Sequence, residues 1–432
     1  MSETTEDLLR VEGLSTRFFT ENGQVNAVSD LDLRIERGEV YGVVGESGSG
    51  KSVTARSIMD LIESPGRITG GEIRYRNPDL ASAVADDYPD AVDGEFVDLL
   101  AVPERIRRSL RGTSFSMIFQ DPESSFNPSI TVGEQLAEAV EVQRRASANP
   151  RSTRARTRSS EYSLGSYVLS TMLPSKRYVT EESRERAIEL LELVGIPDPI
   201  ERADEYPHEY SGGMLQRAMI AQALAGEPDL LIADEPTTAL DVTIQAQILD
   251  LLSDLQAETG MTILLITHNL GVIARMCDRV GVMYAGEIVE RGTLSDVFDD
   301  HVHPYTEGLL GSSPDVDRAG GRLEPIPGNV PSLLDHEMGD RCQFADRCPK
   351  AMEDCLEHPP EFDAAGSAHH EVRCVLAQTE YDESRALPPE YFGEVDRPAA
   401  DLHAGSESDL DDASGSGEPP QPTVDEGGGE RS

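Results

Sequence analysis

The chain has 432 residues, which is enough for about two or three domains with a large buried core. It carries 80 acidic residues against 37 basic ones, so its formal net charge is −43 at pH 7. Because an acidic surface repels polyanions, this charge argues against general binding to DNA, RNA or anionic lipid. The chain contains no stretch of about 18 apolar residues that could cross a bilayer, and it opens without the apolar run of a signal peptide.

The acidic residues extend over the whole chain. Residues 376–432 contribute a net charge of −12, which leaves −31 on the first 375 residues. Only three of the 37 basic residues are lysines, and tryptophan is absent. These features predict a protein adapted to a cytoplasm of molar salt, where carboxylates stay hydrated and their mutual repulsion is screened. An ordinary acidic protein is the alternative.

The N-terminal part of the sequence predicts a β-rich layer followed by a helix. Apolar residues alternate along residues 14–44, with turn signals at ENG and ERGE. Residues 52–63, SVTARSIMDLIE, place apolar side chains at near-helical spacing, and this helix is expected to stop at Pro65. A glycine-rich loop therefore joins a buried strand to a helix.

Two later apolar runs predict central parallel strands. They are LLIADEP, residues 230–236, and TILLITH, residues 262–268, and both end in polar groups. A helical pattern over residues 243–257 separates them, so the core is expected to be α/β. Residues 133–205 are mostly helical in pattern and would form a second lobe.

Three segments do not fit this core. Residues 77–95 are acidic and loop-like, while residues 144–178 begin with six arginines and no acid over 144–160. Both are interpreted as surface insertions. The basic one could touch anionic lipid or an acidic partner loop, although a solvated loop is the favoured interpretation. The acidic tail, residues 376–432, is too polar to bury a core and is predicted to be disordered.

The glycine-rich loop has the spacing of a phosphate-binding loop. Its sequence GESGSGKS fits G-x-x-x-x-G-K-[ST], and its residues are Gly45, Glu46, Ser47, Gly48, Ser49, Gly50, Lys51 and Ser52. Glycines let backbone N–H groups converge on phosphate oxygens, and the helix N-terminus adds partial positive charge. Lys51 would supply a point charge for the β- and γ-phosphates and Ser52 a hydroxyl for Mg²⁺. A chance glycine-rich turn is the alternative, and the flanking strand and helix argue against it.

An acidic pair follows the strand of residues 230–234. Asp234 is suited to holding Mg²⁺ through its water shell, and Glu235 is placed to polarise an attacking water. Taken alone, such a pair is more often a helix cap. Beside a phosphate loop the functional interpretation is favoured, because phosphoryl transfer needs both groups near the γ-phosphate.

Four further motifs resemble those of the ATP-binding cassette (ABC) ATPases. YSGGMLQR, residues 210–217, resembles the signature loop of that family and contains Ser211, Gly212 and Gly213. MIFQDP, TTALD and ITHNL resemble its Q-loop, D-loop and switch motif, with Gln120, Asp241 and His268 as their residues. The resemblance implies a P-loop NTPase fold of class α/β, with a RecA-like parallel-sheet core, an antiparallel β layer and a helical lobe.

The resemblance also implies ligands and roles. In the family, the signature loop of one subunit closes over the ATP γ-phosphate held by the phosphate loop of the opposite subunit, so one copy of each motif implies a dimer. Glu235 would be the base, while Gln120 and His268 would sense and position the γ-phosphate, with Gln120 also beside Mg²⁺. The D-loop aspartate would lie at the dimer seam. Phe18 matches the aromatic that stacks on adenine, with the adjacent Phe19 or a plain core role as alternatives.

The wording of the motifs resembles one branch of this family, the ATPases of peptide/nickel importers. The stretches are GESGSGKSV, MIFQDPESSFNP, YPHEYSGGMLQRAMIAQAL and HPYTEGLL. The resemblance implies a paralogous ATPase subunit or a second copy, two transmembrane permease subunits, and indirectly an extracellular solute-binding protein, with no nucleic acid partner. The chain would lie peripherally on the cytoplasmic face of the membrane, and its cargo stays open.

The same resemblance divides the chain into three parts. Residues 8–312 would form the nucleotide-binding domain, with a helical lobe at about 121–225. Residues 313–375 would form the C-terminal region of these importers, and residues 376–432 the tail. The two insertions make the separation between Lys51 and Asp234 unusually long for the family, and the arginine-rich one falls in or beside the lobe that should contact the membrane subunits.

Four cysteines gather in the C-terminal region: Cys342, Cys348, Cys355 and Cys374. In a chain that reads as cytosolic, soft thiolates at such spacing could hold Zn²⁺ or an iron–sulfur cluster. The first two gaps, five and six residues long, exceed those common in zinc ribbons. Related importers are similar in carrying a [4Fe–4S] cluster here, which favours the cluster. Zinc, with His369 or His370 as a replacement ligand, and unliganded thiols are the alternatives.

Two other functions compete with transport. A soluble ABC ATPase of DNA repair or translation usually brings two cassettes, zinc insertions or coiled coils, which this sequence lacks. A metal-sensing regulatory protein with a degenerate ATPase would not need Glu235, Gln120 and His268 intact. The sequence therefore favours the transport ATPase.

Overall fold

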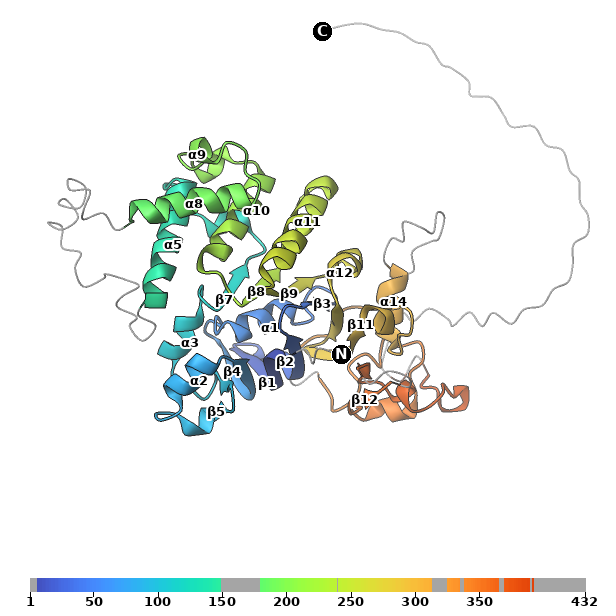
Figure 1. Ribbon diagram of the computed structural model, residues 1–432. Coiled ribbons are helices and arrows are strands. Elements are labelled where there is room, and N and C mark those ends of the chain that lie inside the picture. Colours follow the sequence, from blue (N-terminus) through green and yellow to red (C-terminus); the bar gives the residue numbers. More distant parts are fainter. Residues whose placement is uncertain are drawn as a thin grey trace, which may run out of the picture. The chain divides into compact units, whose positions relative to one another are not determined.

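The computed structural model describes residues 6–148, 179–238, 240–312, 325–334, 338–364, 369–388 and 391 (Figure 1). Its strands are β1 (Asp7–Thr20), β2 (Gly23–Glu36), β3 (Val40–Val44), β4 (Gly66–Arg76), β5 (Val92–Asp93), β6 (Phe96–Asp98), β7 (Phe115–Ile118), β8 (Leu230–Asp234), β9 (Thr262–Thr267), β10 (Arg279–Tyr284), β11 (Glu287–Thr293), β12 (Phe362–Asp363) and β13 (Glu371–Val372).

Most helices lie between β3 and β10. They are α1 (Lys51–Ile58), α2 (Pro78–Val84), α3 (Glu104–Leu110), α4 (Pro122–Ser125), α5 (Val132–Ala148), α8 (Glu181–Leu193), α9 (Pro199–Arg202), α10 (Gly212–Ala223), α11 (Val242–Thr259), α12 (Leu270–Met276), α13 (Leu294–Phe298) and α14 (Pro304–Ser312). Short 3-10 turns are Pro89–Ala91, Pro207–Glu209, Leu224–Gly226, Glu353–Leu356, Val375–Ala377 and Glu383–Arg385.

The strands form two sheets. An antiparallel sheet has the order β2-β1-β4-β6-β5, and a larger sheet has the order β12-β13-β11-β10-β3-β9-β8-β7. Within the larger sheet, β10, β3, β9, β8 and β7 run parallel. The expected parallel core with an antiparallel β layer is therefore confirmed.

Alternating residues of the parallel strands face two different cores. Leu230 and Ile232 of β8, like Leu264 of β9, pack in the core that also contains α1 and the antiparallel sheet. Their neighbours Leu231 and Ala233 pack in the core formed with helices α5, α8, α10 and α11. Since successive strand residues point to opposite faces, a strand covered on both sides must be apolar throughout, as LLIAD and TILLIT are.

The predicted helical lobe is present, and α5, α8, α9 and α10 lie together in Figure 1. A buried carboxylate joins two of these helices. Glu141 of α5 accepts hydrogen bonds from Thr180 Oγ1 and Ser183 Oγ, at 2.9 and 2.6 Å, at the start of α8. Burial raises the pKa of Glu141, but these bonds and one from Arg145 outweigh burial and lower that pKa to about 2.

The expectation of a loop over residues 77–95 is wrong. Asn77 caps α2 by accepting from the Leu80 N–H at 2.8 Å, and β5 and β6 then extend the antiparallel sheet. Ala81, Val84 and Val97 form a small separate core there. The acidic side chains are compatible with this structure because the buried positions recur only every few residues.

The first helix is shorter than the sequence pattern predicts. α1 ends at Ile58 rather than continuing to Pro65, and Asp60 has a left-handed backbone with φ of 53°. Arg111 donates to the carbonyl oxygens of Met59 and Asp60, and Arg107 pairs with the Asp60 carboxylate at 3.0 Å. Side chains from a distant helix thus satisfy the carbonyl groups that the helix would otherwise pair, an interaction that a local pattern does not reveal.

The C-terminal region joins the larger sheet. β13 pairs with β11 and β12 pairs with β13, so this region adds two strands to the larger sheet. The predicted disordered tail begins too early, because Leu387 is buried and its N–H donates to the Ala351 carbonyl at 3.0 Å. The rest of the tail and most of the arginine-rich segment lie outside the described residues. No helix in the described ranges combines the length and apolarity needed to span a bilayer.

Candidate functional site

The loop of residues 45–52 connects β3 to the start of α1, as the sequence predicts. Lys51 is almost fully buried, and its Nζ donates to the carbonyl oxygens of Gly45 and Glu46 at 2.8 Å each. Burial lowers the pKa of Lys51, while the charges of Glu235, Asp234 and Glu46 oppose that change. The ammonium therefore lies among loop oxygens, and the charges of nearby carboxylates stabilise it.

Two glycines of this loop have no room for a side chain. A Cβ on Gly45 would lie 2.1 Å from the Met283 carbonyl oxygen, and one on Gly50 would lie 2.4 Å from the Ala27 carbonyl oxygen. Gly50 also has φ of 108°, a backbone conformation that side chains disfavour. The loop is consequently pressed between β2 and β10, with its backbone free to approach a ligand.

Ser52, near the start of α1, lies beside Asp234, the last residue of β8. The Ser52 hydroxyl donates to Asp234 Oδ1 at 2.9 Å. Burial raises the pKa of Asp234, and the hydrogen bond from Ser52 lowers it. Hydroxyl and carboxylate oxygens are the donors that a hard cation such as Mg²⁺ takes, so this pair fits that ion.

Glu235 is held by three side chains from different parts of the chain. Gln120 Nε2 and Thr238 Oγ1 donate to Oε2 at 3.0 and 2.9 Å, and His268 Nδ1 lies 3.1 Å from Oε1. Burial raises the pKa of Glu235, but the hydrogen bonds from His268 and Thr238 outweigh it and hold that pKa below its ordinary value. Glu235 is therefore a carboxylate at neutral pH.

These groups converge because of the strand order. β3, β9 and β8 are neighbours in the parallel sheet, and β7 follows β8. The residues after their carboxyl ends meet at one edge: the phosphate loop after β3, Glu235 after β8, His268 after β9 and Gln120 after β7. Segments more than 200 residues apart in sequence are brought to one place in this way.

The signature and D-loop residues form a second group. The Ser211 hydroxyl caps α10 by accepting from the Met214 N–H at 3.3 Å, and Asp241 caps α11 with two such bonds at 3.0 Å. A Cβ on Gly213 would lie 2.8 Å from the side chain of Ile244, so the two helix starts are in contact. Ser211 and Gly212 are exposed, and their helix N-terminus is open to a ligand or a partner.

Phe18 and Phe19 lie at the end of β1. Phe18 is half-buried on β1 beside Gly66, while Phe19 is exposed with the Arg67 guanidinium 4.2 Å from its ring centroid. The assignment of the adenine-stacking aromatic stays a prediction.

Comparison with known proteins identifies the family. The model described as ABC transporter matches residues 28–238, and the one described as oligopeptide/dipeptide transporter, C-terminal region, matches residues 289–355. The chain is 42% identical over 372 residues to the dipeptide transport ATP-binding protein of Bacillus subtilis, covering 86% of this chain and 95% of that one. The chain belongs to the ABC transporter family of ATP-binding proteins.

Two further relatives match this chain over nearly their whole length. The dipeptide transport ATP-binding protein of Haemophilus influenzae is 40% identical, with 89% of this chain and 99% of the relative covered. An oligopeptide transport ATP-binding protein of Bacillus subtilis is 41% identical, with 86% and 98% covered. Its family makes this chain an ATPase coupled to transport, with the P-loop NTPase cassette fold.

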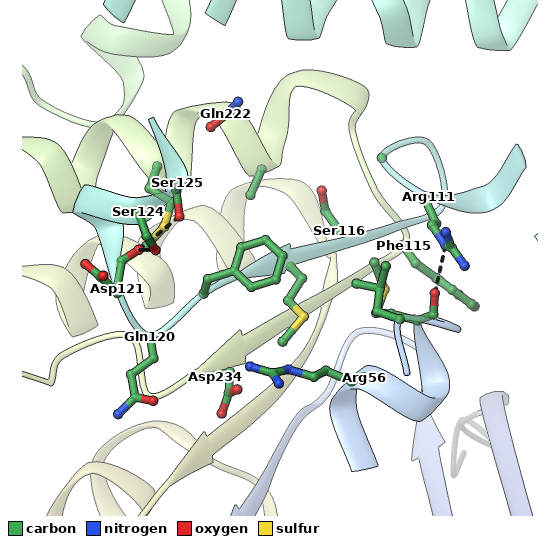
Figure 2. Close-up of a pocket in the computed structure, with 17 residues that line it drawn as sticks. Arg56, Arg111, Phe115, Ser116, Gln120, Asp121, Ser124, Ser125, Gln222 and Asp234 are labelled. Carbon is green, nitrogen blue, oxygen red and sulfur yellow. Dashed lines mark hydrogen bonds between the residues drawn. The ribbon is translucent and has the colours of Figure 1, made fainter. Parts of the chain in front are cut away.

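A pocket lies between the cassette core and the helical lobe. Its volume is about 630 Å³, and its lining residues come from α1, β7, α4 and α10. Figure 2 shows Gln120, Asp234 and Arg56 on one side of the pocket, and Gln222 and the two serines of α4, Ser124 and Ser125, on the other. The Q-loop residue thus lies where a ligand at the phosphate loop and a neighbour at the helical lobe could both reach it.

The four cysteines of the cassette's C-terminal region lie near one another. Burial raises the pKa of Cys374 to about 12, and the pKa of Cys342 rises through burial and the charges of the other three thiols. None of the five cysteines, all of which are described, forms a disulfide. The soft donor set fits a cluster or zinc, but no group of three or more His, Cys, Asp or Glu in the described ranges is arranged to hold a metal ion.

Three side chains at the site were missed by the sequence analysis. Thr238 holds Glu235, Tyr305 Oη accepts from the Glu46 N–H at 2.9 Å, and Arg347 binds the Glu46 carboxylate. Thr238 and Tyr305 lie within TTALD and HPYTEGLL, which were noted only for their resemblance. Arg347 had no signal beyond its place among the cysteines, because its partner is 301 residues away.

Replacement of Gly45 by alanine should weaken nucleotide binding. The new Cβ would collide with the Met283 carbonyl, and such overpacking costs about 1–3 kcal/mol. We expect the Kd for MgATP to rise about tenfold and the thermal midpoint to fall, as measured by nucleotide titration and thermal unfolding. Gly311→Ala is the control, since its Cβ would meet nothing within 4 Å. Unchanged binding in G45A would show that the loop can shift without cost.

Proposed function

We propose that this chain is the ATP-hydrolysing subunit of an ABC importer for peptides or a related small solute. The observation that carries the proposal is the convergence of Lys51, Asp234 and Glu235 at one sheet edge, in a chain whose C-terminal region matches that of oligopeptide/dipeptide transporters. The peptide class comes from the names of the relatives. The non-transport alternative is not favoured, because those relatives are transport proteins.

The phosphate loop would bind the triphosphate of ATP. Lys51 Nζ already donates to loop oxygens and would also bind the γ-phosphate. Loop N–H groups and the start of α1 would hold the β-phosphate. Ser52 and Asp234 would hold Mg²⁺, Ser52 directly and Asp234 through water, with Gln120 beside them. When bound, this ion neutralises charge on the phosphates.

Glu235 would accept the proton of the attacking water. Its carboxylate is charged at neutral pH and is oriented by Thr238, as the base requires. Gln120 and His268 contact the two oxygens of this carboxylate, one each. Both would therefore sense the γ-phosphate and position the water through the same group.

A second ATPase subunit would complete the site. Ser211, Gly212 and Gly213 stand at an exposed helix start, where N–H groups and the helix dipole favour a phosphate held by the opposite chain. The partner would be a paralogous subunit or a second copy, with Asp241 at the seam. ATP binding would close this dimer, and hydrolysis would reopen it.

Two permease subunits and, indirectly, an extracellular solute-binding protein would be the other partners. The chain would then be peripheral on the cytoplasmic face of the membrane. Residues 8–312 would act as the nucleotide-binding domain, with the lobe at about 121–225 contacting the permeases, and residues 313–375 as the C-terminal region.

Replacement of Glu235 by glutamine tests the base assignment. We expect ATP hydrolysis to fall by about 10²–10⁴-fold, because glutamine cannot accept a proton, while MgATP affinity stays within about threefold. Hydrolysis is measured by phosphate release and closure by the accumulation of dimer with ATP. Glu258→Gln, an exposed change on α11, is the matched control. Normal hydrolysis in E235Q would remove Glu235 from the mechanism.

The four thiols Cys342, Cys348, Cys355 and Cys374 are proposed to hold a [4Fe–4S] cluster. The soft donor types support this, zinc is the alternative, and the thiols would have to move, because no group of three or more such side chains in the described ranges is arranged to hold a metal ion. No step of ATP hydrolysis depends on it. Protein purified without oxygen should contain about four iron and four sulfide per chain, with loss of both in C348S. Finding one zinc and no iron per chain would show that the thiols hold zinc instead of a cluster. Finding neither metal would reject both proposals.

We also propose that the protein works in concentrated salt. A net charge of −43 creates repulsion that folding must overcome, and screening reduces it. The thermal midpoint should therefore rise by about 10 °C or more between about 0.1 and 1 M KCl, where the Debye length falls from about 10 to 3 Å. The measurement is thermal unfolding over a KCl series. A thermal midpoint that does not rise over this range would reject the adaptation.

A further inference from the structure

The C-terminal region reaches into the phosphate loop through one arginine. Arg347 Nη1 and Nη2 bind Glu46 Oε2 and Oε1 at 2.7 and 3.1 Å, a two-pronged ion pair between the cysteine-bearing segment and the second residue of the loop. Arg347 is only 2% exposed and the Glu46 side chain 24%, so water reaches only one side of this pair. The structure describes both residues, which are 301 positions apart.

The remaining contacts of Arg347 hold its guanidinium in one place. Its Nε donates to the Pro327 carbonyl at 2.7 Å, and Nη1 also lies 3.3 Å from Tyr284 Oη. The guanidinium stands over the rings of Tyr284 and Phe344, 5.7 and 5.9 Å from their centroids. These rings pack in turn on Tyr305, at 4.5 and 5.4 Å. The arginine is thus fixed before a nucleotide arrives.

Glu46 is fixed at three points. Its carboxylate binds Arg347, its N–H donates to Tyr305 Oη, and its carbonyl accepts from Lys51 Nζ. The last contact joins Glu46 to the ammonium that faces Asp234 and Glu235. A shift of the Glu46 backbone would therefore move an oxygen that holds Lys51.

The segment that carries Arg347 is held by backbone hydrogen bonds of Cys342 and Cys355. Cys348 follows Arg347 directly, the Ala345 N–H donates to the Cys342 carbonyl at 3.1 Å, and the Cys342 N–H donates to the Cys355 carbonyl at 3.1 Å. The position of Arg347 consequently depends on how the segment of residues 342–355 is folded.

We propose that Arg347 is a positioning residue for the phosphate loop: it fixes the Glu46 side of the loop, so that docking of the cysteine-bearing segment sets how tightly the chain binds MgATP. This rests on the proposed binding of MgATP at that loop. The cation acts through Glu46 and Lys51 and does not itself touch the nucleotide. The segment is thereby part of the nucleotide site as well as an addition to the sheet.

A second buried arginine provides a matched control. Arg373, 9% exposed, anchors the same region to β2 through the carbonyl of Asp30 at 3.1 Å and its carboxylate at 3.4 Å. It contacts no residue of the phosphate loop in the described structure. Arg347→Gln and Arg373→Gln therefore both remove a buried cation from the C-terminal region, but only the first releases Glu46.

The test measures MgATP binding by the full-length chain, with a fluorescent ATP analogue and competition by MgATP, beside thermal unfolding. We expect Arg347→Gln to raise the Kd about 5–50-fold and the KM for ATP in parallel, with a smaller change in kcat. Arg373→Gln should lower the thermal midpoint similarly and change the Kd less than about twofold. Equal effects of the two changes on the Kd, or no effect of Arg347→Gln, would overturn the proposal.

A double-mutant cycle separates this pair from general damage. Glu46→Gln should weaken MgATP binding as Arg347→Gln does. The Kd of the double variant should not exceed that of the single variant that binds MgATP less tightly, because each change removes the same interaction. Additive losses would overturn the proposal. If Arg347→Gln does not fold, Arg347→Lys, which keeps the charge but not the two-pronged geometry, takes its place. Failure of the wild-type chain to bind MgATP would instead overturn the proposed function.

Discussion

The site depends on a buried ammonium group. Lys51 is almost fully buried, its Nζ is bonded to two loop carbonyls, and the charges of Asp234 and Glu235 stabilise its ammonium. A buried cation of this kind is stable only while its partners keep their places, since losing one leaves charge without compensation. The glycines pressed between β2 and β10 and the hydrogen bonds to Glu235 hold those partners.

The parallel sheet supplies the frame for this arrangement. Strands β3, β9 and β8 are apolar on both faces, so neither face can turn toward water, and their carboxyl ends stay at one edge. The helices α5, α8 and α10 of the helical lobe are not part of this sheet. The signature residues lie at the start of α10. This division leaves Ser211 exposed while Lys51 is buried.

The C-terminal region is joined to the cassette by buried polar pairs as well as by apolar packing, in which Phe344 and Leu387 belong to the main core. His370 binds the fully buried Glu290 at 2.9 Å, His358 binds Glu287 at 2.9 Å, and Arg347 binds Glu46. Paired charges of this kind specify where a small segment docks, because a misplaced segment would leave a carboxylate buried alone. The region thus reaches β11 and the phosphate loop with few residues.

The sequence by itself determined the local features of this protein. The spacing of GESGSGKS, the apolar runs of β8 and β9, and the helix pattern after Asp241 each involve residues close in the chain, so their geometry follows from short-range sterics and hydrogen bonding. Tertiary structure decided the rest. Three features depend on partners tens to hundreds of residues away. They are the early end of α1, where Arg111 binds the Met59 carbonyl, the folding of residues 77–95 onto the antiparallel sheet, and the pairing of Arg347 with Glu46. Such contacts are selected by packing and burial, which a local pattern does not contain.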